Sequence, residues 1–199
     1  MVCRRVFSKD LDEMWAMSKS CAVNSYAVVG VALAWILLYL INYFVLPAVR
    51  YSALASLIFL PAMLRPVAVL LFGPAGVAGL FVGGLITAYF DPSFEGSLVA
   101  INLISASAGL FAIILLRGSP RFASELGPDL AGLKLRTILV VTLLTASISS
   151  ILLNGFYASN GINSSVEQSL AMAVGDTIGS LIMLYLAASG LRFLRRLAE

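Results

Sequence analysis

The stretch that decides the fold is YAVVGVALAWILLYLINYFVL, residues Tyr26–Leu46, which contains no charged residue. As an α-helix that rises about 1.5 Å per residue, it is long enough to cross the roughly 30 Å hydrocarbon layer of a bilayer. A mixed-charge segment precedes it, and no small-residue cleavage pattern follows it. We therefore expect a retained membrane anchor and not a signal peptide.

The rest of the chain repeats this apolar pattern. Of its 199 residues, 60% are hydrophobic and only 12% are charged, a composition outside the range of soluble globular domains. Apolar runs predict helices over residues 26–46, 52–71, 75–90, 97–116, 137–155 and 168–191. The predicted fold is therefore all-α: a polytopic bundle of about six transmembrane helices within residues 22–194.

The basic residues indicate the orientation of this bundle, because cytoplasmic loops of inner-membrane proteins are enriched in Lys and Arg. Of the 13 basic residues, four precede the first helix, four lie between the fourth and fifth helices, and three lie at the C-terminal end. Six crossings place these segments on one side, and the opposite loops then hold only Arg50. We predict a multi-pass protein of the bacterial inner membrane, with residues 1–21 and 195–199 in the cytoplasm.

The N-terminal segment has a composition of its own. Val6, Leu11, Met14, Trp15 and Met17 are apolar and lie among mixed charges. This pattern is typical of an amphipathic helix on the membrane surface, and we expect one here; because the apolar face is narrow, the alternative is a loosely ordered tail.

Composition also excludes several classes of function. The chain contains no histidine, the commonest metal ligand and general base. It has no Walker loop, nucleotide-binding glycine fingerprint on a βαβ unit, or nucleophile elbow. We expect no enzyme activity, no cofactor and no metal. The net charge of +3 is explained by orientation and by anionic lipid, so we expect the bilayer as partner and no nucleic acid. Cys3 and Cys21 fall on the predicted cytoplasmic side, where disulfides are rare.

Glycines recur within the predicted helices at spacings that bring small residues onto one face. Small-xxx-small spacing lets the backbone of a neighbouring helix approach closely. The alternative is a site for a partner helix or a ligand. The glycines expected to pack helices are Gly73, Gly76, Gly79, Gly83, Gly175 and Gly179.

Two charges, Arg65 and Asp176, fall inside predicted helices, where a charge is costly unless it faces the bundle interior. Their depths along the two helices place them within reach of each other. We predict an ion pair at a polar centre of the bundle, supported by Asn102, Ser105, Thr142 and Thr145. Three roles stay open: a clasp that fixes packing, an Arg65 side chain that extends to the headgroups, and a binding site for an anionic or polar ligand.

Pro61 and Pro66 bracket the segment that contains Arg65. Each removes a backbone donor, so the helix predicted over residues 52–71 should be kinked or broken there. Broken helices beside an ionisable side chain are a recurring way to build a polar site at membrane depth.

The stretches Leu60–Arg65 (LPAMLR), Leu70–Gly83 (LLFGPAGVAGLFVG) and Val174–Gly179 (VGDTIG) resemble the MASE1 family of bacterial membrane sensor domains; the stretch from Asn102 to Gly109 is a weaker match. The resemblance covers roughly the second to the sixth helix and implies membrane signalling. MASE1 regions usually have about eight helices and precede an output domain. The resemblance therefore implies either an output from a separate partner chain or a freestanding relative whose role has shifted.

A second resemblance leads to a different function. Phe72–Gly76 (FGPAG) followed by a glycine-spaced helix is similar to the substrate-binding S components of energy-coupling factor transporters. That family implies binding of a vitamin-like solute, with Ala27, Gly30 and Ala34 docking a coupling subunit. The predicted outer loops are short and poor in aromatic residues, which argues mildly against a lidded pocket. A structural subunit of a larger membrane complex is the third alternative.

Overall fold

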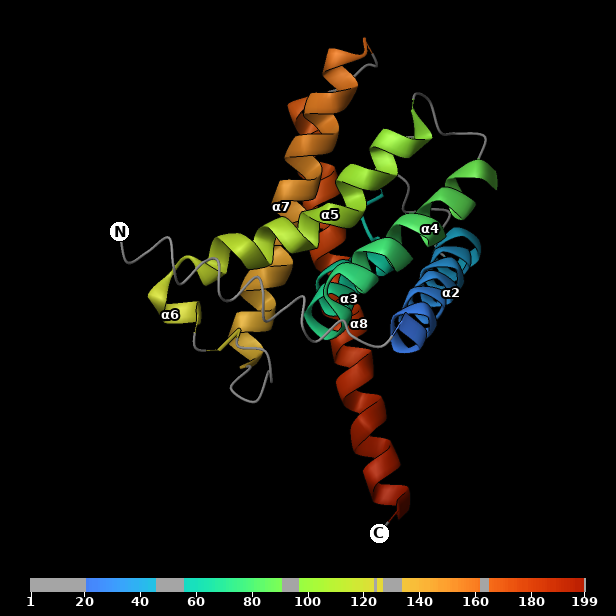
Figure 1. Cartoon of the computed structure of the whole chain (residues 1–199), viewed down its shortest axis with the longest axis vertical. Helices are drawn as coiled ribbons and strands as arrows, with labels where there is room; N and C mark the ends of the chain where they lie inside the picture. The colour runs from blue at the N-terminus through green and yellow to red at the C-terminus, as the bar shows by residue number, and fades with distance from the viewer. Residues whose placement is uncertain are drawn as a thin grey trace.

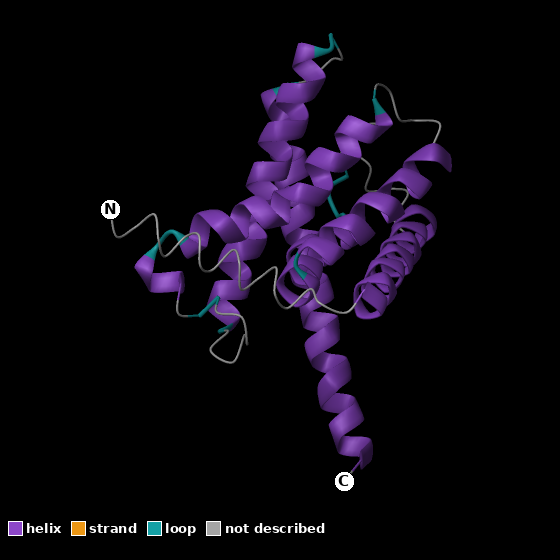
Figure 2. Ribbon diagram, viewed as in Figure 1, coloured by secondary structure: helices purple, strands orange, loops and turns teal. Residues whose placement is uncertain are grey.

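The computed structural model describes residues 21–45, 56–90, 97–123, 125–126, 134–161 and 165–198. These residues are helical almost throughout and contain no β-strand (Figure 2). The elements are α2 (Cys21–Val45), the 3₁₀ helix η2 (Leu60–Met63), α3 (Leu64–Phe72), α4 (Pro74–Phe90), α5 (Leu98–Arg117), the short α6 (Pro120–Ala123), α7 (Leu135–Ser159) and α8 (Val166–Ala198). The prediction of an all-α chain is confirmed for the described residues.

Within the described ranges, four helices are long and apolar enough to cross a membrane: Asn24–Val45, Leu98–Arg117, Leu135–Ser159 and Val166–Leu186. The apolar helices Leu60–Phe72 and Pro74–Phe90 are shorter. The predicted count of six crossings and the predicted orientation therefore remain predictions. Residues 1–20, including the predicted amphipathic helix, lie outside the described residues.

Packing arranges the helices in two groups. α7 and α8 run side by side along the long axis of the molecule, α5 packs on α7, and α2 packs mainly on α4 (Figure 1). The short α3 lies between these groups and contacts α2, α4, α5 and α7. The second half of α8 continues beyond the other helices and ends at the marked C-terminus (Figure 1). Residues 195–198, expected as a separate tail, are part of this helix.

Apolar side chains lie on the outside of the bundle as well as in its core. Large apolar residues such as Leu33, Phe44, Leu103 and Leu143 are exposed. Buried positions include many polar side chains: Asn42, Arg65, Thr87, Asn102, Ser105, Thr137, Thr142, Thr145, Ser149, Ser150, Asn154, Gln168, Asp176 and Ser180. Exposed hydrocarbon around an interior that holds both apolar and polar side chains is expected of a bundle whose solvent is lipid.

The helix predicted over residues 52–71 is broken, as Pro61 and Pro66 indicated, but the break is larger than a kink. Residues 56–59 have no helical assignment, Phe59 is extended (φ −122°, ψ 92°), and the described part of this segment becomes helical at Leu60, while residues 52–55 lie outside the described residues. Other helices supply the missing hydrogen bonds: Phe59 N donates to the Gly175 carbonyl (3.1 Å), and Leu60 N donates to Asn42 Oδ1 (3.1 Å). In lipid such groups must be satisfied within the protein.

Gly175 and Gly179 allow this extended segment to lie on α8. A Cβ at Gly175 would stand 1.8 Å from the Ser56 carbonyl oxygen, and one at Gly179 would stand 2.2 Å from that of Phe59. Their spacing predicted close approach of another helix. The neighbour is instead an extended chain, which can approach more closely because it has no surrounding turn of side chains.

The other glycines have separate roles. Gly79 and Gly83 face α2, where an added Cβ would come within 2.8 Å and 2.9 Å of the carbonyl oxygens of Val28 and Ala32. Gly76 likewise faces the Ala68 carbonyl at 2.1 Å. Gly73, predicted to pack helices, has no such neighbour within 4 Å; its positive φ of 55° makes it the turn between α3 and α4.

Candidate functional site

Arg65 and Asp176 form a buried ion pair, as predicted. Arg65 is the second residue of α3, and Asp176 lies in the first third of α8. An Nη1 group of Arg65 donates to Asp176 Oδ2, and the two residues are only 5% and 6% exposed. A buried charge is tolerated when an opposite charge and hydrogen bonds compensate its lost solvation. The pair therefore fixes the start of α3 against α8.

Arg65 also contacts three uncharged side chains. Nη1 donates to Ser149 Oγ on α7 (3.2 Å). The guanidinium carbon lies 5.6 Å from the ring centroid of Trp35 on α2 and 5.5 Å from that of Phe59. At these distances the ring faces attract a cation, and the attraction is stronger where water is excluded. Arg65 is thus held inside the bundle, 5% exposed.

The two rings are themselves held in place. Trp35 and Phe59 meet edge to face with centroids 6.0 Å apart and an interplanar angle of 69°. Trp35 Nε1 donates to Thr87 Oγ1 on α4 (3.2 Å), and Thr87 Oγ1 in turn donates to the Gly83 and Gly84 carbonyls. Side chains from α2, α7, α8 and the extended segment therefore meet around the Arg65 charge of α3. Thr87 of α4 holds one of the two rings.

The four polar residues predicted to support the pair are buried, but they do not bond to it. Asn102 Nδ2 donates to the Leu98 carbonyl (2.8 Å), and Thr145 Oγ1 donates to that of Val141 (2.7 Å), both within their own helices. Thr142 Oγ1 has no hydrogen-bonding partner among the described residues. Ser105 is buried on α5. Each forms part of the polar interior, and none of them bonds to Arg65 or Asp176.

Sequence reasoning missed Ser149, Trp35 and Phe59. For Ser149 a signal was available, since it lies one helical turn after Thr145 and so on the same face. Trp35 and Phe59 gave no local signal, because an aromatic residue in an apolar helix is ordinary. Their contact with Arg65 depends on how distant segments fold together.

Arg65 Nε is buried and has no hydrogen-bonding partner among the described residues. An unpaired donor at this depth is costly. The site is therefore a nearly neutral charge pair with hydrogen-bonding capacity left over, at the junction of a broken helix and a long helix. Such a site can bind a polar group or change its pairing.

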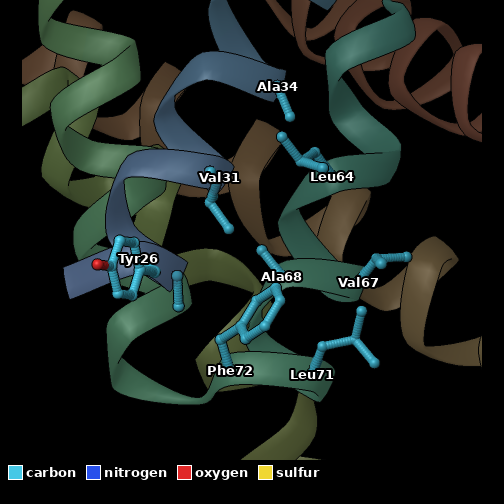
Figure 3. A pocket seen from close by; sticks show the side chains of 10 residues that line it. Tyr26, Val31, Ala34, Leu64, Val67, Ala68, Leu71 and Phe72 are labelled. Carbon is cyan, nitrogen blue, oxygen red and sulfur yellow. The ribbon is translucent and has the colours of Figure 1, made fainter. Parts of the chain in front are cut away.

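An apolar groove of about 510 Å³ lies between α2 and α3 (Figure 3). Ala27, Gly30 and Ala34 of α2 line one side, and Val67 and Leu71 of α3 line the other. A Cβ at Gly30 would meet nothing within 4 Å, unlike those at Gly79 and Gly83. This part of α2 is therefore a small-residue surface that the described chain leaves uncovered.

A second ion pair lies beside the start of α7, outside the candidate spans. Lys134 Nζ contacts Glu125 Oε1 at 2.9 Å, and Thr137 Oγ1 donates to Glu125 Oε2. The hydrogen bond from Thr137, then that from Lys134, holds the pKa of Glu125 below its ordinary value. This pair, in which Lys134 is exposed and Glu125 is half-buried, serves as a comparison for the buried one.

Comparisons with protein-family models, with curated proteins and with solved structures found no match to this chain. The resemblances to MASE1 and to S components therefore remain predictions from the sequence.

Proposed function

We propose that this chain is a sensory or signalling-scaffold protein of the bacterial inner membrane that acts through a separate partner chain. The observation that carries the proposal is the buried Arg65–Asp176 pair, which joins the broken helix to α8. An ionisable pair at membrane depth is the default candidate for a functional site. The resemblance to MASE1 supports the same role.

α8 is suited to carry a change at the pair to the end of the molecule. It is a single helix from Val166 to Ala198, and the 22 residues after Asp176 correspond to about 33 Å. Its second half continues beyond the bundle (Figure 1). A signal that alters the pairing of Arg65 would shift α8 relative to α3, and a partner chain at the far end of α8 would receive that shift.

In the proposed arrangement the chain crosses the membrane six times, with both ends of the chain in the cytoplasm. The distribution of basic residues supports this orientation. The lipid bilayer surrounds the exposed apolar side chains. The signal is a small polar or anionic molecule, or a change in the membrane, that competes for the hydrogen-bonding groups of Arg65.

The groove between α2 and α3 favours one alternative, a transport component. Ala27, Gly30 and Ala34 are the residues that the S-component resemblance assigns to docking of a coupling subunit, and all three line the groove. Its occupant in that case is a helix of the coupling subunit, which would approach α2 at Gly30.

Affinity purification of the tagged chain from its native membrane in gentle detergent, followed by mass spectrometry, separates the two functions. We expect a kinase, a cyclase or another signalling chain, whose output changes in Asp176→Asn and Arg65→Gln variants. The matched control is Lys134→Gln, which breaks the pair with Glu125 and should leave the output unchanged. An ATPase that co-purifies with a coupling subunit, and is lost in Gly30→Leu, would contradict the signalling role.

A further inference from the structure

A polar seam lies between α7 and α8. It consists of six buried or half-buried residues, Ser149, Ser150, Asn154, Gln168, Ser169 and Asp176. On α8, residues 168, 172, 176 and 180 follow one another at four-residue spacing and therefore share a face. They are Gln168, Met172, Asp176 and Ser180, and this face is turned towards the buried side of the helix.

Hydrogen bonds link the two helices along this seam. Ser150 Oγ donates to the Ser169 carbonyl (2.5 Å) and lies 2.8 Å from Ser169 Oγ. Asn154 Nδ2 contacts the Ser150 carbonyl (2.9 Å) and Met172 Sδ (3.3 Å). Next to Ser150, Ser149 accepts a hydrogen bond from Arg65. The seam therefore continues from the joined ends of α7 and α8 to the ion pair.

Three atoms along this route have no hydrogen-bonding partner among the described residues. They are Gln168 Nε2, Asn154 Oδ1 and Arg65 Nε. Gln168 and Asn154 are each only 8% exposed. Gln168 lies one turn before Met172, the residue that Asn154 contacts, so the two amides lie on the same part of the seam.

The chemistry of these atoms identifies what they bind. Gln168 Nε2 and Arg65 Nε can only donate, whereas Asn154 Oδ1 can only accept. A molecule that satisfies all of them must both accept and donate within a narrow space. Ordered water does this, and buried water typically makes about three hydrogen bonds to such groups.

We propose that the polar seam binds ordered water and gives the Arg65–Asp176 pair contact with the aqueous compartment at the joined ends of α7 and α8. From Gln168 to Asp176 this route is about 12 Å long, eight residues along the helix. The lipid-facing side of the same helices, at Ile151 and Leu170, is exposed and apolar. Water enters between the helices and not from the lipid.

Water-edited solid-state NMR of the full isotope-labelled chain in lipid bilayers tests this. Magnetisation from water should reach Gln168 Nε2, the Asn154 side chain and Arg65 Nε several times faster than it reaches Asn102 Nδ2. Asn102 is equally buried (7% exposed), but its amide donates within its own helix. Transfer to the two amides no faster than to Asn102 would overturn the proposal, as would transfer that reaches them but not Arg65.

A pair of variants tests the route itself. Gln168→Leu replaces the entry amide with a hydrocarbon side chain and should slow transfer to Arg65 Nε several-fold. Leu170→Gln, which adds a polar group on the lipid-facing side, should not change it. Undiminished transfer to Arg65 in Gln168→Leu would overturn the route. Hydration is measured without any partner chain, so failure here is distinguishable from failure of the proposed signalling role.

Discussion

At Arg65, a cation, two aromatic rings, a hydroxyl and a carboxylate come together from separate parts of the chain. The sequence predicted the carboxylate partner, because two charges inside apolar helices at similar depth have few other ways to be compensated. It did not predict the rings of Trp35 and Phe59, which stabilise the cation from two sides. Loss of any one of these neutral groups should therefore cost the pair less stability than loss of one of its two charges.

Removing one charge should therefore destabilise the bundle more than removing both. We expect Asp176→Asn or Arg65→Gln to lower the free energy of unfolding by about 3–5 kcal/mol, since each leaves a buried charge without its partner. The free energy of unfolding of the double variant Arg65→Met/Asp176→Leu should fall by less than the sum of the losses in the two single variants. Unfolding in detergent by chemical denaturant measures all three. Additive losses would show that the pair is not coupled.

Glu125 allows a prediction about pH. Its lowered pKa means that the carboxylate contributes stability above its ordinary pKa, and that this contribution is lost as pH falls through the lowered value. Thr137→Val and Lys134→Gln should each raise the pKa of Glu125, because the hydrogen bond from Thr137 and the hydrogen bond and charge of Lys134 all lower it. Carbon-13 NMR titration of the Glu125 carboxyl measures both. An unchanged pKa in Thr137→Val would contradict the geometry.

At the scale of elements, the extended segment before η2 is the feature that sets this bundle apart from a set of packed helices. Its backbone lies on α8 at two glycines, and its amides bond to α8 and α2. The prolines predicted a break, because proline removes backbone hydrogen bonds. They did not predict what the released chain would pack against, since that depends on α8, more than a hundred residues away.

Glycine substitutions separate the covered surfaces from the open one. Gly175→Ala should destabilise the protein by about 1–3 kcal/mol, because its Cβ would stand 1.8 Å from a backbone oxygen that cannot move without the segment. Gly30→Ala should be neutral or slightly stabilising, since its Cβ meets nothing within 4 Å and alanine favours helix. Thermal unfolding in the same detergent compares the two. Equal losses would contradict the packing at Gly175.

At the scale of the whole molecule, four helices in the part of the chain that the structure describes reach the length of a membrane, and the short α3 and α4 do not. Two arrangements of α3 and α4 leave the segment after α4 on the same side of the membrane. In the first, α3 and α4 each cross the membrane, one after the other. In the second, they enter and leave the membrane on one side as a hairpin. In both, Gly73 makes the turn. The position of that turn distinguishes them.

Labelling the turn tests the proposed six crossings. With Cys3 and Cys21 replaced by serine, Phe72→Cys, at an exposed residue beside the turn, should react with a membrane-impermeant thiol reagent from the cytoplasmic side. The control is Leu143→Cys, on the exposed face of α7 within a candidate span, which should stay unmodified because a thiolate does not form in hydrocarbon. Phe72→Cys protected from both sides would indicate a hairpin within the membrane.

The sequence alone determined the features that depend on local composition. Apolar runs predicted helical segments for every long element. The prolines predicted the break, and the two isolated charges predicted their own pairing. The tertiary structure decided which side chains surround Arg65, that Gly175 and Gly179 hold an extended chain, and that a polar seam joins α7 and α8. These features are contacts between segments far apart in the sequence. Hydropathy and spacing specify which faces must be buried, whereas only the folded chain specifies what covers each face.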